Sequence, residues 1–100
     1  VDEGDIVTFG STSLKVFFTP GHSPASVCFY NEADKFIVSG DVLFRRSIGR
    51  TDLPGGDYAT LMQSIKEKLM VLPDDIKVYA GHMQPTTIGE ERRENPFLNE

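Results

Sequence analysis

Two imidazoles and one carboxylate each follow a glycine at the end of a predicted strand. Glycine lets the backbone turn sharply and approach a neighbour closely, so the side chain after it can point into a site. Two imidazoles and a carboxylate form a common ligand set for zinc, iron or manganese. A lone histidine is more often structural, but both of the chain's 2 histidines have this Gly-His setting, so the residues alone leave both interpretations open. The three residues are His22, Asp41 and His82.

Three arginines follow the carboxylate of this set within six positions. Arg45, Arg46 and Arg50 stand in an otherwise acidic chain. They form either a solvated charge cluster or a docking point for the carboxylates of a substrate.

The composition excludes several classes of protein. With 100 residues, 39% of them hydrophobic and 10% aromatic, the chain can form one domain with a core, and it is neither disordered nor transmembrane. The net charge of −5 provides no global field for nucleic acid or an acidic membrane surface, so we expect neither partner.

The lone Cys28 cannot form an internal disulfide, which favours core packing and a cytoplasmic location. Because the chain begins at Val1 with no methionine and no signal peptide, we expect a fragment of a longer protein.

Hydrophobic patterning predicts strands in the first half of the chain. The runs at 6–9 and 14–18 form one predicted hairpin, and those at 26–30 and 36–39 form a second. In the second run, Leu14, Val16 and Phe18 make one face wholly apolar, while the opposite face is mixed.

Helices and one more strand follow. Asp57 is a predicted N-cap for a helix that runs to about Leu72, with a stripe of leucine and isoleucine at spacings of four, four and three. A strand is predicted at 76–80, and capping-box spacing at 87–90 predicts a helix from Ile88 to about Asn95. This order predicts one α+β domain over residues 1–100, with the helices on one face of the sheet.

Ordered motifs over nearly the whole chain resemble the metallo-β-lactamase superfamily, and within it the hydroxyacylglutathione hydrolases (glyoxalase II). Residues 19–26 (TPGHSPAS) are similar to the family's T-P-G-H-T-P-G-S loop. Residues 39–44 and 47–52 resemble its G-D-x-L-F and G-R-T-D segments. Residues 79–82 and 85–98 resemble the G-H and T-T-I-G-E-E-x-x-x-N-P-F ending of short bacterial members.

The resemblance implies a fold and a metal site. The chain would be the C-terminal half of the family's αββα sandwich. His22 would bind the first metal, Asp41 would bridge both, and His82 would bind the second. The complete site would hold two zinc ions, or iron or manganese. The family's H-x-H-x-D-H motif is absent from this sequence, so the site in this chain would be incomplete. Two further departures, Ala25 for a glycine and residues 83–85 for a glycine-proline pair, put the wall beside the second metal in doubt.

The same resemblance implies an activity. The metals would supply a hydroxide that cleaves a thioester of glutathione or a similar small anionic thiol. Arg50 would bind the carboxylates of the glutathione part of the substrate. An aspartate at 41, where three-histidine zinc β-lactamases carry cysteine, disfavours antibiotic hydrolysis. Two alternatives stay open: an iron persulfide dioxygenase, which shares the segment at 49–52, and a non-catalytic interaction domain.

Half of a fold also predicts a surface. We expect the chain alone to be inactive, and its natural partner to be the N-terminal half of the same fold. One apolar face of the sheet should be bare, and such a face favours self-association or strand exchange between copies. The predicted residues of that face are Phe17, Val27, Phe29 and Ile37.

Overall fold

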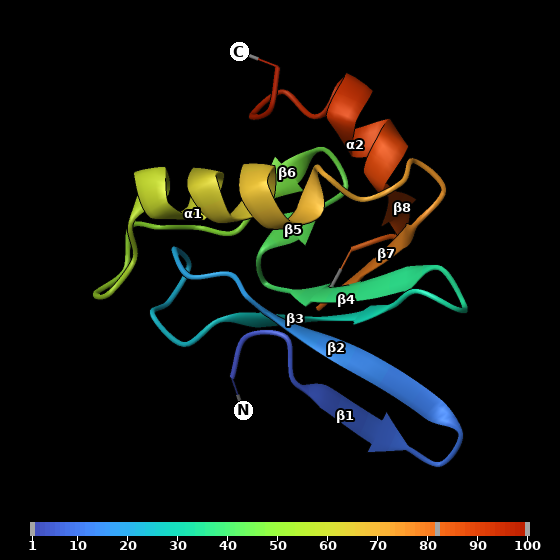
Figure 1. Cartoon of the computed structure of the whole chain (residues 1–100). Helices are drawn as coiled ribbons and strands as arrows, with labels where there is room; N and C mark the ends of the chain where they lie inside the picture. Colours follow the sequence, from blue (N-terminus) through green and yellow to red (C-terminus); the bar gives the residue numbers. More distant parts are fainter. Residues whose placement is uncertain (1, 82, 100) are drawn as a thin grey trace.

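The chain forms a six-stranded mixed sheet with its helices on one side (Figure 1). The computed structural model describes residues 2–81 and 83–99. The strand order in the sheet is β1-β2-β3-β4-β7-β8, and the predicted α+β class with helices on one face is confirmed. The first four strands form an antiparallel meander of β1 (Ile6–Phe9), β2 (Thr12–Phe18), β3 (Val27–Asn31) and β4 (Phe36–Gly40).

A crossover then leads to a parallel neighbour of β4. The crossover contains a small hairpin and a helix, and β7 pairs parallel with β4 before β8 turns back antiparallel. The predicted single helix is shorter than expected: its last turn is a π-helix that ends at Leu69, and Met70 N–H donates to the Ile65 carbonyl at 2.9 Å. The elements are β5 (Leu43–Phe44), β6 (Ser47–Ile48), α1 (Tyr58–Ser64), the π-helix η1 (Ile65–Leu69), β7 (Lys77–Ala80), β8 (Thr86–Thr87) and α2 (Ile88–Glu94).

The predicted helix caps are present. The Asp57 carboxylate accepts a hydrogen bond from Thr60 N–H at 3.0 Å, and the Thr87 hydroxyl accepts one from Glu90 N–H at 3.1 Å. Only half of the capping box forms, because the Glu90 carboxylate accepts hydrogen bonds from Thr86 and Arg46 instead. Among the described residues, no helix is long and apolar enough to cross a bilayer.

The core lies between the helical layer and one face of the sheet. Leu61, Ile65 and Leu69 of the predicted stripe are fully buried, and they belong to one cluster with Ile37 and Val78 of the sheet. Cys28 belongs to the same cluster, as expected for a packing residue, and its burial raises the pKa of the thiol to about 11.

The opposite face of the sheet is turned away from the helices, and we call it the open face. On β2 this face is the wholly apolar side of the strand. Residues paired directly across strands share a face. Val16 pairs with Phe29, Phe29 with Val38, and Val38 with Tyr79, so these four form one row across the sheet. Val38 and Tyr79 are 37% and 41% exposed, whereas Val16 at the other end of the row is fully buried.

The predicted bare face is therefore half wrong. Phe29 lies in the open row, and Val27, two residues before it, shares its face. Ile37 is fully buried, and Phe17 packs against the core and stacks on Tyr30 with ring centroids 5.6 Å apart. The strand pattern identifies the two faces of β2, but it does not say which face the helix covers, and the helix covers the mixed one.

Candidate metal centre

His22 is held in a loop that packs tightly on the start of α1. Gly21 has φ +136°, and a Cβ there would come within 2.3 Å of the Leu61 backbone, so only glycine fits. The Gly21 carbonyl accepts a hydrogen bond from Asp57 N–H at 2.7 Å, which ties the loop to the helix N-cap. The backbone that carries His22 is therefore fixed by the helix.

The imidazole of His22 has a defined orientation. Its Nδ1 lies 2.8 Å from the Arg50 carbonyl oxygen. A carbonyl only accepts, so Nδ1 carries the proton and Nε2 of the neutral ring keeps its lone pair. A backbone carbonyl on the far nitrogen is the usual way in which a metal-binding histidine is oriented.

Asp41 directly follows β4 and faces this imidazole. Gly40, at φ +52°, turns the chain at the end of the strand, where the β4–β7 register also shifts. The Asp41 Oδ2 atom lies 4.0 Å from His22 Nε2, with the carboxylate side chain 52% and the imidazole 24% exposed. Both side chains are partly exposed, unlike a buried structural pair.

The end of β7 meets the same carboxylate. Gly81 N–H donates to the Gly40 carbonyl at 2.8 Å, and a Cβ at Gly81 would lie 3.1 Å from Asp41 Oδ1. His82 lies outside the described residues, so its predicted place beside His22 and Asp41 stays a prediction. Within residues 2–81 and 83–99, no three histidine, cysteine or acidic side chains form a metal-binding group.

Gly49 has a role that the sequence reasoning missed. A Cβ at this position would come within 2.0 Å of the Asp41 carbonyl oxygen and 3.3 Å of the His22 Cβ. Glycine therefore lets the segment after β6 lie against both candidate ligands. The sequence pattern pointed to glycines that directly precede a candidate ligand at the end of a strand. Gly49 instead precedes Arg50, and it matters because the absence of a side chain lets the backbone come close to Asp41 and His22.

A cavity of about 340 Å³ opens beside His22 and Asp41. Its wall combines these polar groups with apolar side chains from the β5–β6 hairpin. The lining residues are His22, Asp41, Phe44, Ser47, Ile48, Gly49, Arg50 and Met83.

The three arginines have three different environments. Arg50 lines the cavity and donates two hydrogen bonds to Asp52, at 2.8 and 3.0 Å, which raise the pKa of Arg50 and lower that of Asp52. Arg45 donates to the Gln84 side chain at 3.0 Å. Arg46 pairs with two glutamates of α2. Of the three arginines, Arg50 is the one in the wall of the cavity, and the substrate roles of all three stay predictions.

The donor set of the pair suits a metal ion. An imidazole nitrogen and a carboxylate oxygen bind zinc at about 2.0–2.2 Å in tetrahedral geometry, so two such ligand atoms of one ion lie about 3.4 Å apart. The 4.0 Å between His22 Nε2 and Asp41 Oδ2 is slightly wider, so the two side chains would have to close a little on a bound ion. His22 and Asp41 would therefore contribute two ligands, and a closed site needs more.

Comparison with known proteins decides the family. A sequence pattern described as the Metallo-beta-lactamase superfamily matches residues 1–82. The chain belongs to this superfamily. Two curated relatives are the "Hydroxyacylglutathione hydrolase GloC" of Haemophilus influenzae, 48% identical, and the "Probable metallo-hydrolase YqgX" of Bacillus subtilis, 49% identical. Each alignment covers 97% of this chain and 46% of the relative, so the chain spans about half the length of these proteins.

Solved structures of the superfamily superpose on the whole chain. The BLEG-1 B3 metallo-beta-lactamase has a TM-score of 0.94 at 47% identity, covering 100% of this chain and 48% of that one. ETHE1 from Myxococcus xanthus has a TM-score of 0.93 at 35% identity, with 100% and 46% covered. TTHA1623, solved in a di-iron-bound form, has a TM-score of 0.89 at 46% identity, with 98% and 47% covered. The chain thus matches about half of each of these metallo-beta-lactamase folds.

Proposed function

We propose that the whole protein is a metal-dependent hydrolase that cleaves a thioester of glutathione or a similar small anionic thiol. The observation that carries this proposal is the oriented His22–Asp41 pair at the rim of a cavity that also contains Arg50. The relative named hydroxyacylglutathione hydrolase, 48% identical over 97% of this chain, supports the substrate class.

In this proposal His22 and Asp41 hold part of the metal centre. Zinc is the expected metal, and the di-iron-bound form of TTHA1623 makes iron a second choice. A metal ion bound there supplies an acidified water and polarises a carbonyl. The chain itself contributes an imidazole whose Nδ1–H points at the Arg50 carbonyl, so that the neutral ring presents its Nε2 lone pair, and a carboxylate that faces this nitrogen.

The rest of the cavity suits an anionic thioester. The Arg50 guanidinium can form paired, charge-assisted hydrogen bonds with a substrate carboxylate, as it does with Asp52 here. Phe44 and Ile48 supply an apolar wall for the acyl group and the thioester sulfur. Replacing Arg50 with glutamine should raise KM about tenfold with a smaller change in kcat, because a charged hydrogen bond contributes about 1.5–3 kcal/mol. The exposed Lys66→Gln variant is the matched control.

We also propose that the open face of the sheet packs against the remaining half of the same fold. The face has a continuous apolar row, and the chain spans about half the length of its relatives. The 100-residue chain alone should self-associate through this face. Sedimentation should show larger species that Val38→Lys reduces, while Val71→Lys, at an exposed residue after the helix, should not change them. A monomer at high concentration would contradict this proposal.

β-Lactam hydrolysis is the second candidate. The aspartate at position 41 disfavours this function in the sequence. BLEG-1, described as a B3 metallo-beta-lactamase, is nevertheless 47% identical over the full length of this chain. The two candidates differ in substrate, and in this chain both would use a metal held in part by His22 and Asp41.

Turnover by the metal-loaded whole protein separates the candidates. Hydrolysis of S-lactoylglutathione that is lost in Asp41→Asn and kept in Asp34→Asn would support the proposal, since Asp34 is an exposed carboxylate in the β3–β4 turn. Hydrolysis of a penicillin with no thioesterase activity would favour the second candidate. Oxygen consumption with a glutathione persulfide, or no turnover of any of these compounds, would contradict both.

A further inference from the structure

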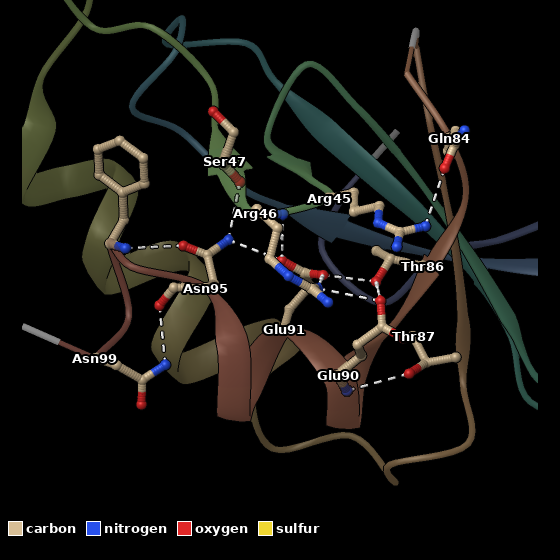
Figure 2. Close-up of polar contacts among 11 residues, drawn as sticks. Arg45, Arg46, Ser47, Gln84, Thr86, Thr87, Glu90, Glu91, Asn95 and Asn99 are labelled. Atoms are coloured by element: carbon tan, nitrogen blue, oxygen red, sulfur yellow. Dashed lines mark hydrogen bonds and ion pairs between the residues drawn. The ribbon is translucent and has the colours of Figure 1, made fainter.

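A buried carboxylate of α2 lies at the end of the hairpin that walls the cavity. Figure 2 shows Glu91 reaching from the helix toward the turn between β5 and β6. Its side chain has no exposed surface. One oxygen accepts from Arg46 N–H at 2.7 Å, and the other accepts from the Arg46 guanidinium at 2.8 Å and the Thr86 hydroxyl at 2.6 Å. Backbone and side chain of one turn residue are thus bound by one carboxylate.

Asn95 extends this contact by one more residue of the hairpin. It is fully buried, and its side-chain amide donates to the Ser47 carbonyl at 3.1 Å and to Glu91 at 3.0 Å (Figure 2). Over the described part of the chain, every buried side-chain nitrogen and oxygen has a hydrogen-bond partner. A buried polar network of this kind is rigid when all its members are satisfied.

The other end of the hairpin is fixed at the metal ligands. Gly49 N–H donates to the Val42 carbonyl at 2.9 Å, and Gly49 packs against the Asp41 carbonyl. The next residue, Arg50, presents the carbonyl that accepts the His22 Nδ1 proton. The hairpin therefore spans from the Glu91 network to the group that orients the imidazole.

We propose that Glu91, together with Asn95, is a positioning residue for the metal centre: it anchors the β5–β6 hairpin, and the anchored hairpin holds the Arg50 carbonyl on His22. The expected effect on metal binding rests on the metal-dependent function proposed above. The anchoring of the hairpin rests on the hydrogen bonds just described. Among the described residues, Glu91 binds Arg46, Thr86 and Asn95 and neither His22 nor Asp41, so its proposed effect on metal binding is indirect.

The decisive variant is Glu91→Gln in the whole protein. It keeps the volume and one accepting oxygen but places an amide NH₂ against hydrogen-bond donors. Glu94→Gln is the matched control, because Glu94 is an exposed glutamate of the same helix. Val16→Ala, at a buried residue of β2, controls for general loss of stability.

Three measurements test whether Glu91 affects the hairpin, the His22 imidazole and metal binding. Amide exchange at Arg46 and Gly49 should accelerate at least about tenfold more in Glu91→Gln than in Val16→Ala. The His22 Nδ1–H signal in the NMR spectrum should broaden or disappear. Zinc affinity should fall about tenfold, the lower end of the range for residues that orient metal ligands. Neither control should change the imidazole signal or the zinc affinity.

Faster exchange at Arg46 with an unchanged imidazole signal would overturn the proposal and leave Glu91 as a purely structural residue. If the whole protein binds neither zinc nor iron, the proposed function fails, and the His22 signal alone decides this inference. If Glu91→Gln does not fold, amide exchange in the unaltered protein still tests the anchoring of the hairpin. The Arg46 amide, although in a turn, should exchange as slowly as the Val78 amide in β7. Exchange of the Arg46 amide as fast as that of the exposed Ala33 would refute the anchoring.

Discussion

Two carboxylates in this chain sit in opposite environments. Asp41 has a side chain that is 52% exposed, lines a cavity and faces an imidazole 4.0 Å away. Glu91 has no exposed surface, and the hydrogen bonds of its two oxygens come from the protein itself. The hydrogen bonds of Glu91 are buried inside the protein, whereas Asp41 lies in the wall of a cavity.

This difference separates stability from function. A buried, satisfied charge stabilises one arrangement of the backbone, and its loss is costly because its partners remain buried. A partly exposed pair of side chains such as His22 and Asp41 adds little to the free energy of unfolding. We therefore expect Glu91 variants to change stability first and Asp41 variants to change metal binding first.

The largest expected effect is on stability at Glu91. Replacing Glu91 with alanine should lower the free energy of unfolding by about 3 kcal/mol, because four donors lose a buried acceptor. Urea denaturation measures this change. Glu94→Ala on the exposed side of α2 should stay within about 0.5 kcal/mol of the unaltered chain. A loss of less than about 1 kcal/mol at Glu91 would abolish the contrast between the two carboxylates.

The next effect is metal-dependent stability. Zinc at one hundred times its dissociation constant should stabilise the folded whole protein by about 2.7 kcal/mol. Asp41→Asn should remove most of this gain and leave the metal-free stability within about 0.5 kcal/mol of the unaltered protein. Thermal unfolding with zinc and with a chelator gives both quantities. Equal zinc stabilisation in the variant would show that the ion binds elsewhere.

A smaller effect is expected at the arginine beside the cavity. The Arg50–Asp52 pair is exposed, so Asp52→Asn should change the free energy of unfolding by less than about 1 kcal/mol. The guanidinium, freed from an internal carboxylate, should bind an anionic ligand such as glutathione a few times more tightly. Calorimetry on the whole protein measures this affinity, and Asp75→Asn, at the exposed Lys35–Asp75 pair, is the control. Weaker binding in Asp52→Asn would instead show that Asp52 holds Arg50 in its binding position.

The smallest effect is a pH dependence at the edge of the Glu91 network. Hydrogen bonds from Thr86 and then Arg46 lower the pKa of Glu90 below its usual 4.5. Its stabilising contribution is therefore present above about pH 4.5 and is lost as the pH falls through the lowered folded-state pKa. Glu90→Gln should flatten the acid limb of a stability-against-pH curve. An unchanged slope would mean that the Thr86 and Arg46 hydrogen bonds do not persist in solution.

The sequence predicts the elements better than the contacts between them. Alternation and caps predicted the two hairpins of the meander and the start of both helices, since Asp57 and Thr87 act locally, but not the pairing of β2 with β3. The β5–β6 hairpin was missed because its strands have two residues each, too few for a periodic signal. The covered face of the sheet was only half predicted, because the pattern in β2 does not contain the position of the helix.

The candidate site shows the same limit. Glycine before His22 and Asp41 predicted strand-end positions for both, and the structure places these two side chains together. Glu91 was not singled out, although it shares a helix face with Ile88 and Asn95, and a charge on a buried face is itself a signal. Its partner Arg46 lies 45 residues earlier, and the sequence alone does not pair the two.

A zinc titration of the 100-residue chain, followed by calorimetry and NMR, tests the central claim that His22 and Asp41 are its metal-binding pair. We predict weak binding of a single ion, with the strongest spectral changes at these two residues, loss of binding in Asp41→Asn and no loss in Asp34→Asn. Because a firmly held cation needs more ligands than this pair, the chain alone should not hydrolyse S-lactoylglutathione. Tight binding of two ions with turnover, or zinc-induced changes that leave His22 and Asp41 unaffected, would contradict this account.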